Sequence, residues 1–285
     1  MTGNGSPMSF LEHQELTSKL QLIARDLRIL ALKMITEAAS GHPGGSLSAA
    51  DLISTLYFHY LHHNPQDPHW EERDRFVLSK GHGVPILYAA LVKCGYFPEE
   101  EIFTLRKINS RLQGHPDHVR LPFMETSSGS LGQGLSIAQG MALAAQLNKK
   151  EYKIYCLLGD GEIQEGQIWE TAMSAPKFKL DNLIAIIDAN GGQIDGFTKE
   201  VMDLSPLANK WDAFNWDVQE IDGHDYHQII TAFDRAQQTQ KKPHLIIART
   251  VKGKGVSFME NNIDWHGTAP NAKQRDAAIE ELLKH

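Results

Sequence analysis

The stretch KIYCLLGDGEIQEG, residues 153–166, runs from an apolar segment into a carboxylate that stands between two glycines. Residues 153–158 are short and apolar on both faces, which predicts a strand buried between two layers of helices, as in a parallel sheet. Asp160 follows just after this strand, and Gly159 and Gly161 allow a ligand to approach the backbone closely. The stretch therefore predicts a functional carboxylate at the carboxyl end of a strand, where open parallel sheets bind ligands.

Short apolar segments alternate with helical patterns along the chain. The predicted strands are 75–79, 153–158, 182–187, 216–221 and 244–249, and the predicted helices among them are 85–94, 132–148, 165–175, 205–214 and 226–240. Helices 17–39 and 48–61 precede the first strand, the second beginning with a capping pair of Ser48 and Asp51, and helix 272–285 closes the chain. This alternation predicts one doubly wound α/β domain, residues 15–285, after a flexible extension of residues 1–14.

Composition narrows the class of protein. The chain has 285 residues, of which 41% are hydrophobic, and a formal net charge of -7, so it can bury a sizeable core and is not expected to bind nucleic acid. It shows no apolar run of membrane-spanning length and no signal peptide, which predicts a cytoplasmic protein that does not bind membranes. Cys94 and Cys156 lie far apart in apolar surroundings, so both are expected to be free, buried thiols.

A second polar residue follows the next predicted strand. Asn190 comes after strand 182–187, and a single crossover helix separates this strand from the one before Asp160. The carboxylate and the amide oxygen are therefore expected to converge at one edge of the sheet. Such hard oxygen ligands suit Mg²⁺, or Ca²⁺ as a substitute, and the following helix N-terminus favours a phosphate. The alternative is a tight turn in which Asp160 only caps the next helix.

Seven motifs give the chain a resemblance to the amino-terminal part of transketolase, a thiamine-diphosphate enzyme, over roughly residues 16–270. They are SGHPGG (40–45), SKGHG (79–83), GSLGQG (129–134), GDGEIQEG (159–166), DANGGQIDG (188–196), IDGHD (221–225) and WHG (265–267), in the order of the family. The resemblance implies the diphosphate-binding domain of the thiamine-diphosphate-binding fold.

The resemblance also implies a set of site residues. The metal would be held by Asp160, Asn190 and the carbonyl of Gly192, and the catalytic residues would be His42, His82, His266 and Glu165. Residues implied in cofactor binding are His82, Gly129, Leu131, Gly159, Asp160, Gly161, Asn190 and His266. Glu165, with Glu170, would belong to an acidic network at a subunit interface. The glycines around the histidines agree with this, because they permit close contact by a ligand that imidazole can hydrogen-bond.

The activity implied is transfer of a two-carbon ketol unit from a ketose or ketose phosphate to an aldose. Because the chain ends soon after the first domain, we expect a separate carboxy-terminal subunit to bind the pyrimidine ring, with two copies of each chain. Asn109 stands where larger relatives carry a histidine before a second GHP motif, which puts ordinary sugar-phosphate specificity in question. His115 of that motif is given no catalytic role, and His224 is expected to orient a loop.

Three alternatives belong to other classes. A related thiamine-diphosphate enzyme could form acyloins from an α-keto acid, although GHPGG and SLGQGL match transketolase better. A nicotinamide dehydrogenase would need a G-x-G-x-x-G fingerprint after its first strand, which is missing. A non-catalytic remnant of the fold would be expected to have lost its metal ligands, whereas Asp160 and Asn190 are both present.

Overall fold

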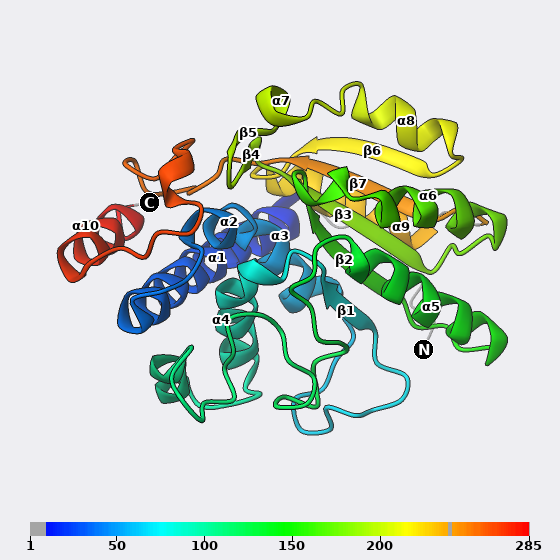
Figure 1. Cartoon of the computed structure of the whole chain (residues 1–285). Helices are drawn as coiled ribbons and strands as arrows, with labels where there is room; N and C mark the ends of the chain where they lie inside the picture. The colour runs from blue at the N-terminus through cyan, green and yellow to red at the C-terminus, as the bar shows by residue number, and fades with distance from the viewer. Residues whose placement is uncertain (1–9, 239–240, 285) are drawn as a thin grey trace.

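The computed structural model describes residues 10–238 and 241–284 (Figure 1). Its helices are α1 (Phe10–Ala38), α2 (Pro43–Ser48), α3 (Ala50–Thr55), α4 (Val84–Cys94), α5 (Gln133–Leu147), α6 (Gly166–Lys177), α7 (Thr198–Val201), α8 (Leu207–Ala213), α9 (Tyr226–Gln238) and α10 (Ala272–Leu282). The strands are β1 (Arg75–Leu78), β2 (Ile154–Gly159), β3 (Leu183–Ala189), β4 (Gly192–Gln193), β5 (Gly196–Phe197), β6 (Asp217–Asp222) and β7 (His244–Arg249).

Five of the strands form one parallel sheet in the order β1-β2-β3-β7-β6. Side chains alternate along β2: Tyr155 and Leu157 join a core with α1, α3, α4 and α9, whereas Cys156 and Leu158 join a second core with α5, α6 and α8. Figure 1 shows these two groups of helices on opposite faces of the sheet. The predicted doubly wound α/β fold is therefore confirmed.

The amino-terminal helices differ from the prediction. Helix α1 begins at Phe10, so residues 10–14 are helical and not part of an extension, while residues 1–9 of that extension lie outside the described residues. The helix expected from Ser48 begins earlier, with Pro43 in its first turn, where the missing N–H of proline has no cost. The predicted capping pair is wrong, because the Ser48 hydroxyl donates to Asp188, 140 residues away.

Other boundaries agree closely, and a few short elements were not predicted. Strand β7 has the predicted bounds, and α4 and α5 differ from theirs by one residue at an end. The β4–β5 hairpin and the short helix α7 follow the DANGG motif and were missed, because two-residue strands carry no periodic pattern. Cys94 and Cys156 are free, as predicted. Among the described residues, no helix has the length and apolar character needed to cross a bilayer.

Candidate functional site

Sheet register brings the two predicted metal ligands together. Gly159, the last residue of β2, pairs with Asp188 of β3, so the turns that follow the two strands lie side by side. The carboxylate of Asp160 accepts hydrogen bonds from the backbone N–H of Gly161 (3.0 Å) in its own turn and of Gly191 (2.6 Å) in the neighbouring turn. Helix α6 begins only at Gly166, so Asp160 is not its cap.

Asn190 and Gly192 complete a set of oxygen ligands. The Asn190 amide donates to Asp188 (3.1 Å), and its oxygen accepts from the N–H of Gly192 (3.1 Å). A carboxylate, an amide oxygen and a main-chain carbonyl are the hard ligands that Mg²⁺ prefers, usually with phosphate oxygens completing its shell. Burial, and next the charge of Asp188, raise the pKa of Asp160 to about 6, so this carboxylate lacks a full counter-charge. The donor set thus fits a divalent cation.

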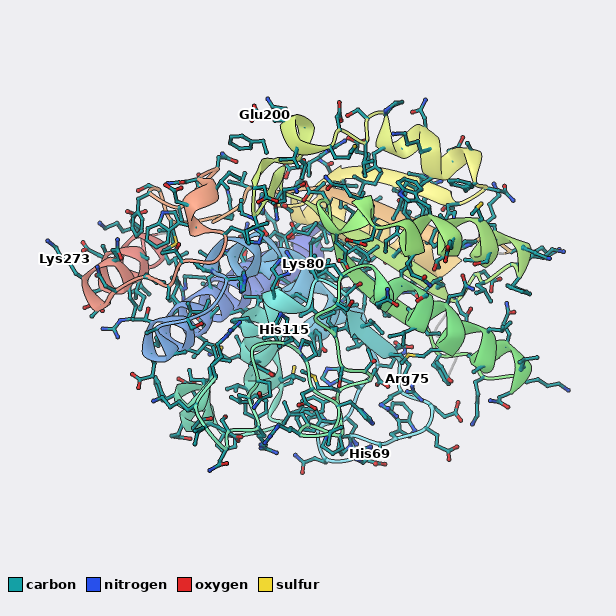
Figure 2. All side chains as sticks on the ribbon, in the orientation of Figure 1. His69, Arg75, Lys80, His115, Glu200 and Lys273 are labelled. Carbon is teal, nitrogen blue, oxygen red and sulfur yellow. The ribbon has the colours of Figure 1, made fainter. Side chains whose placement is uncertain are left out.

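A buried ion pair that was not predicted lies below this site. Lys80, which is 1% exposed, pairs with Asp188 and donates to the carbonyl of Gly45 (2.8 Å). Asp188 also accepts from the hydroxyls of Ser48 (2.6 Å) and Thr250. Burial alone would raise the pKa of Asp188, but Lys80 outweighs it and the pKa is lowered. The pair fastens the SKGHG and GHPGG motifs to β3, and Figure 2 shows Lys80 in the middle of the molecule.

Three predicted histidines form a cluster. The ring centroids of His42, His82 and His266 lie 5.1 to 5.6 Å apart, although the residues come from three distant loops. Burial is the main cause that lowers their pKa values, to about 4 for His42, to about 3 for His266 and well below the ordinary value for His82. All three are therefore neutral near pH 7.

The cluster has unused hydrogen-bonding capacity. The Nδ1 atoms of His42 and His266 are buried and have no hydrogen-bond partner among the described residues. Buried polar atoms are nearly always satisfied in folded proteins, so unsatisfied ones in a group of neighbouring rings point to a ligand. A Cβ atom on Gly45 would lie 3.2 Å from Lys80 Nζ and 3.6 Å from His82 Nε2, so the cluster adjoins the Lys80–Asp188 pair. Together these groups fit an anionic, hydroxylated ligand near the metal ligands.

His115, which was given no catalytic role, lies beside the same cluster. A Cβ on Gly129 would come within 3.2 Å of its ring, and its charge and that of Arg106 both lower the pKa of His42. Figure 2 shows His115 on the loop in front of α4. Asn109, by contrast, is exposed in a turn at φ 62°. The second GHP motif was the signal that could have identified His115.

Lys252 was also missed. Its side chain is 2% exposed and its Nζ donates to the carbonyl of Gly192 (3.1 Å), the third predicted metal ligand. A Cβ on Gly44 or on Gly192 would lie 3.0 or 2.9 Å from this side chain, so both glycines are needed to seat it. Burial lowers the pKa of Lys252 to about 8, and Lys80 adds to this effect. The KGKG stretch by itself predicts only a loop.

Comparisons with known proteins identify the family. The sequence model for the transketolase thiamine diphosphate binding domain matches residues 19–282. The chain belongs to the transketolase family. It is 47% identical over 265 residues to the 6-deoxy-6-sulfo-D-fructose transketolase subunit SqwG of Clostridium sp. (strain MSTE9), covering 93% of this chain and 96% of that subunit. It is 44% identical over 263 residues to one subunit of the apulose-4-phosphate transketolase of Phocaeicola vulgatus, covering 92% and 93%.

Solved transketolases share the fold. The structure of transketolase from Campylobacter jejuni superposes with a TM-score of 0.88 at 36% identity, over 93% of this chain and 43% of that one. The chain therefore corresponds to the amino-terminal, thiamine-diphosphate-binding part of transketolase, in the form found in relatives named as subunits. The predicted family and fold are confirmed, and the nicotinamide dehydrogenase alternative is wrong.

Some residues assigned from the transketolase resemblance lie at the surface. Glu165 and Glu170 are exposed in this chain, and Leu131 is 36% exposed. The buried acid of the GDGEIQEG motif is instead Glu162, which accepts from the N–H groups of Gly132 and Gly159 (3.0 Å each). The sequence did not distinguish these glutamates, because only the turn geometry decides which one points inward. The assigned roles of Glu165 and Leu131 stay predictions.

Proposed function

We propose that this transketolase chain transfers a two-carbon ketol unit from a ketose or ketose phosphate to an aldose, using thiamine diphosphate and Mg²⁺ together with a separate carboxy-terminal subunit. The observation that carries the proposal is the meeting of Asp160 and Asn190 on neighbouring strands beside a cluster of neutral, unsatisfied histidines. Since the relatives reported above are named transketolases or transketolase subunits, ketol transfer is favoured over the acyloin-forming alternative.

The residues would divide the work between binding and proton movement. Asp160, Asn190 and the Gly192 carbonyl would hold the metal, and the positive charges of Lys80 and Lys252 would favour a diphosphate nearby. When bound, thiamine diphosphate supplies the nucleophilic carbon that accepts the ketol unit.

The histidine cluster would act on the substrate. Neutral imidazoles can donate to sugar hydroxyl and carbonyl oxygens through one nitrogen and accept a proton at the other. His42, His82 and His266 are neutral and close together, so they can orient the ketose and carry its protons at the reacting carbons. His115 extends this surface, and Arg106 adds a positive charge beside it that suits an anionic donor sugar.

The substrate and partner are finer parts of the proposal. Relatives named for sulfonated and phosphorylated ketoses support an anionic donor. The chain spans 43% of a larger transketolase, which supports a second subunit that completes the site, in an assembly of two copies of each chain. Glu165 and Glu170, both exposed on or just before α6, would lie at that interface.

The test is reconstitution. The chain is purified with and without the carboxy-terminal transketolase subunit encoded beside it, and supplied with thiamine diphosphate, Mg²⁺, an aldose acceptor and a panel of ketose phosphate donors. We expect turnover of roughly 1–1000 per second only for the pair. Absence of ketol transfer by the pair with every donor, while an α-keto acid is decarboxylated, would overturn the proposal in favour of the acyloin-forming alternative.

A further inference from the structure

A buried hydrogen-bond network lies outside the histidine cluster, between α1, α3 and the turn after β6. The Asp51 carboxylate accepts from both guanidinium nitrogens of Arg28 (3.1 and 2.6 Å), from the Tyr226 hydroxyl (2.8 Å) and from His224 Nδ1 (2.6 Å). Burial alone would raise the pKa of Asp51, but Arg28 and His224 outweigh it and hold the pKa well below its usual range. Asp51 is therefore a fixed anion.

This anion sets the tautomer of His224. The backbone N–H of Val251 donates to His224 Nε2 (2.8 Å), so Nε2 carries the lone pair. The ring proton must then be on Nδ1, where it is donated to Asp51. With one donor and one acceptor in fixed positions, the imidazole of His224 has a single orientation, and it transmits that orientation to the backbone of the loop after β7.

The residue that follows Val251 is Lys252, whose amine donates to the Gly192 carbonyl. The loop is held at its other side by Gly253, which has φ 77° and donates its N–H to the Gly44 carbonyl (3.0 Å). A side chain on Gly253 would come within 2.4 Å of the Met259 carbonyl, so the turn has little freedom. His224 and Gly44 thus hold the loop from opposite sides of Lys252.

We propose that His224 is a positioning residue for the metal and diphosphate site, acting through the Val251 N–H to place Lys252 against the Gly192 carbonyl. The inference rests on the proposed function for the identity of that site. His224 itself lies on the wall of a separate cavity of about 480 Å³, together with Arg28 and Asp51. Water in this cavity can solvate polar groups freed by a substitution, so variants at this position are expected to fold.

Two substitutions separate the two hydrogen bonds. In His224→Asn the amide lies at the level of Nδ1, so it can donate to Asp51 but cannot reach Val251. In His224→Gln the amide oxygen lies at the level of Nε2, so it can accept from Val251 while the bond to Asp51 is lost. His227→Asn is the matched control, because His227 is exposed on α9.

The readouts use the ligand-free chain. For His224→Asn we expect amide hydrogen exchange in a peptide spanning 250–254 to rise about tenfold, as expected for one lost backbone hydrogen bond. Acylation of Lys252, which is 2% exposed in the intact chain, should rise several-fold. His224→Gln should stay within about twofold of the wild type and of the control in both measurements, and Tm should change little in all three variants.

Unchanged exchange and labelling in His224→Asn would overturn the inference. Equal acceleration in both His224 variants, accompanied by a lower Tm, would also overturn it, because it would show a general structural contact. The thiamine diphosphate affinity of the wild-type chain assembled with its partner tests the proposed function separately. If that assembly binds the cofactor and His224→Asn binds it equally well, only the positioning role fails.

Discussion

Asp160 and the three clustered histidines share one property, which is that the fold does not fully satisfy them. The carboxylate is buried with a pKa raised to about 6, and two imidazole nitrogens are buried without a partner among the described residues. Such groups cost stability in the empty site and are favoured only when a ligand completes their interactions. The mechanism therefore predicts that substitutions here affect ligand binding and turnover more than folding.

Removing the Asp160 carboxylate should weaken cofactor binding that depends on Mg²⁺. Because even indirect partners of metal ligands change affinity by about 10–100-fold, Asp160→Ala should weaken thiamine diphosphate binding by at least that factor in the assembled enzyme. Calorimetric titration with and without EDTA checks this, and EDTA should have the same effect on the wild type. Asp195→Ala, which removes an exposed carboxylate from the nearby hairpin, is the control. Equal affinities in both variants would refute the metal assignment.

Single alanine substitutions of His42, His82 and His266 should lower kcat by about ten- to ten-thousand-fold, because each removes a positioned hydrogen-bonding or proton-transfer group. Circular dichroism and Tm should stay close to the wild type. His69→Ala serves as the control, since this exposed histidine lies at the edge of the molecule in Figure 2. Unaltered kcat and KM in all three cluster variants would contradict the site.

At the scale of elements, Glu162 joins three segments. Its carboxylate accepts from the Ser79 hydroxyl after β1, from the Gly132 N–H before α5 and from the Gly159 N–H at the end of β2. A neutral amide at this position would turn N–H groups toward other N–H groups. The position of the GDG turn relative to α5 therefore depends on this buried acid.

Glu162→Gln should lower the free energy of unfolding by about 1–3 kcal/mol, the usual cost of leaving buried polar groups unsatisfied. Urea denaturation followed by circular dichroism measures it. Glu170→Gln, at an exposed position of α6, should change stability by no more than about 0.5 kcal/mol. Similar midpoints for the two variants would show that Glu162 does not hold the three segments together.

Two glycines of α5 should respond in opposite ways to alanine. A Cβ on Gly134 would lie 2.4 Å from the Ser79 hydroxyl, so Gly134→Ala must push α5 away from the end of β1 and should destabilise the chain by about 1–3 kcal/mol. A Cβ on Gly140 meets no atom within 4 Å, so Gly140→Ala should stabilise by up to about 1 kcal/mol through helix propensity. Thermal unfolding compares the pair, and shifts of the same sign would contradict the packing argument.

At the scale of the whole molecule, large apolar side chains are exposed around the surface that carries Glu165. Leu131 is 36% exposed, Met173 of α6 is 55% exposed and Phe178 at the end of α6 is 44% exposed. Exposed apolar groups gathered near a functional site commonly mark where a partner docks. This agrees with the proposed carboxy-terminal subunit.

Met173→Lys should therefore weaken association with the carboxy-terminal subunit by at least about tenfold, as expected for a charge placed in an apolar contact. Analytical ultracentrifugation or co-purification measures it. Leu11→Lys replaces a side chain that is 70% exposed on α1, away from α6, and should leave association unchanged. Normal assembly of the Met173 variant would exclude this face of α6 from the interface.

The order and type of the main elements could be predicted from the sequence because they depend on local pattern. Continuous apolar runs such as 182–187 can be buried only between two layers, and parallel strands place their carboxyl ends at one edge. The same reasoning predicts, from sequence alone, that Asp160 lies beside Asn190. The start of α1 was misplaced because residues 10–14 show little apolar periodicity and are held by the rest of the helix.

Only the tertiary structure decided which charged groups are buried and what they contact. Lys80 meets Asp188 across 108 residues and His224 meets Asp51 across 173 residues, so no local pattern records either pair. The free energy of a buried charge depends on its desolvation and on its nearest partner, and both are set by segments that come together only in the folded chain. For the same reason the sequence indicated the type of ligand, while the fold selected Glu162, Lys252 and His115 as the residues around it.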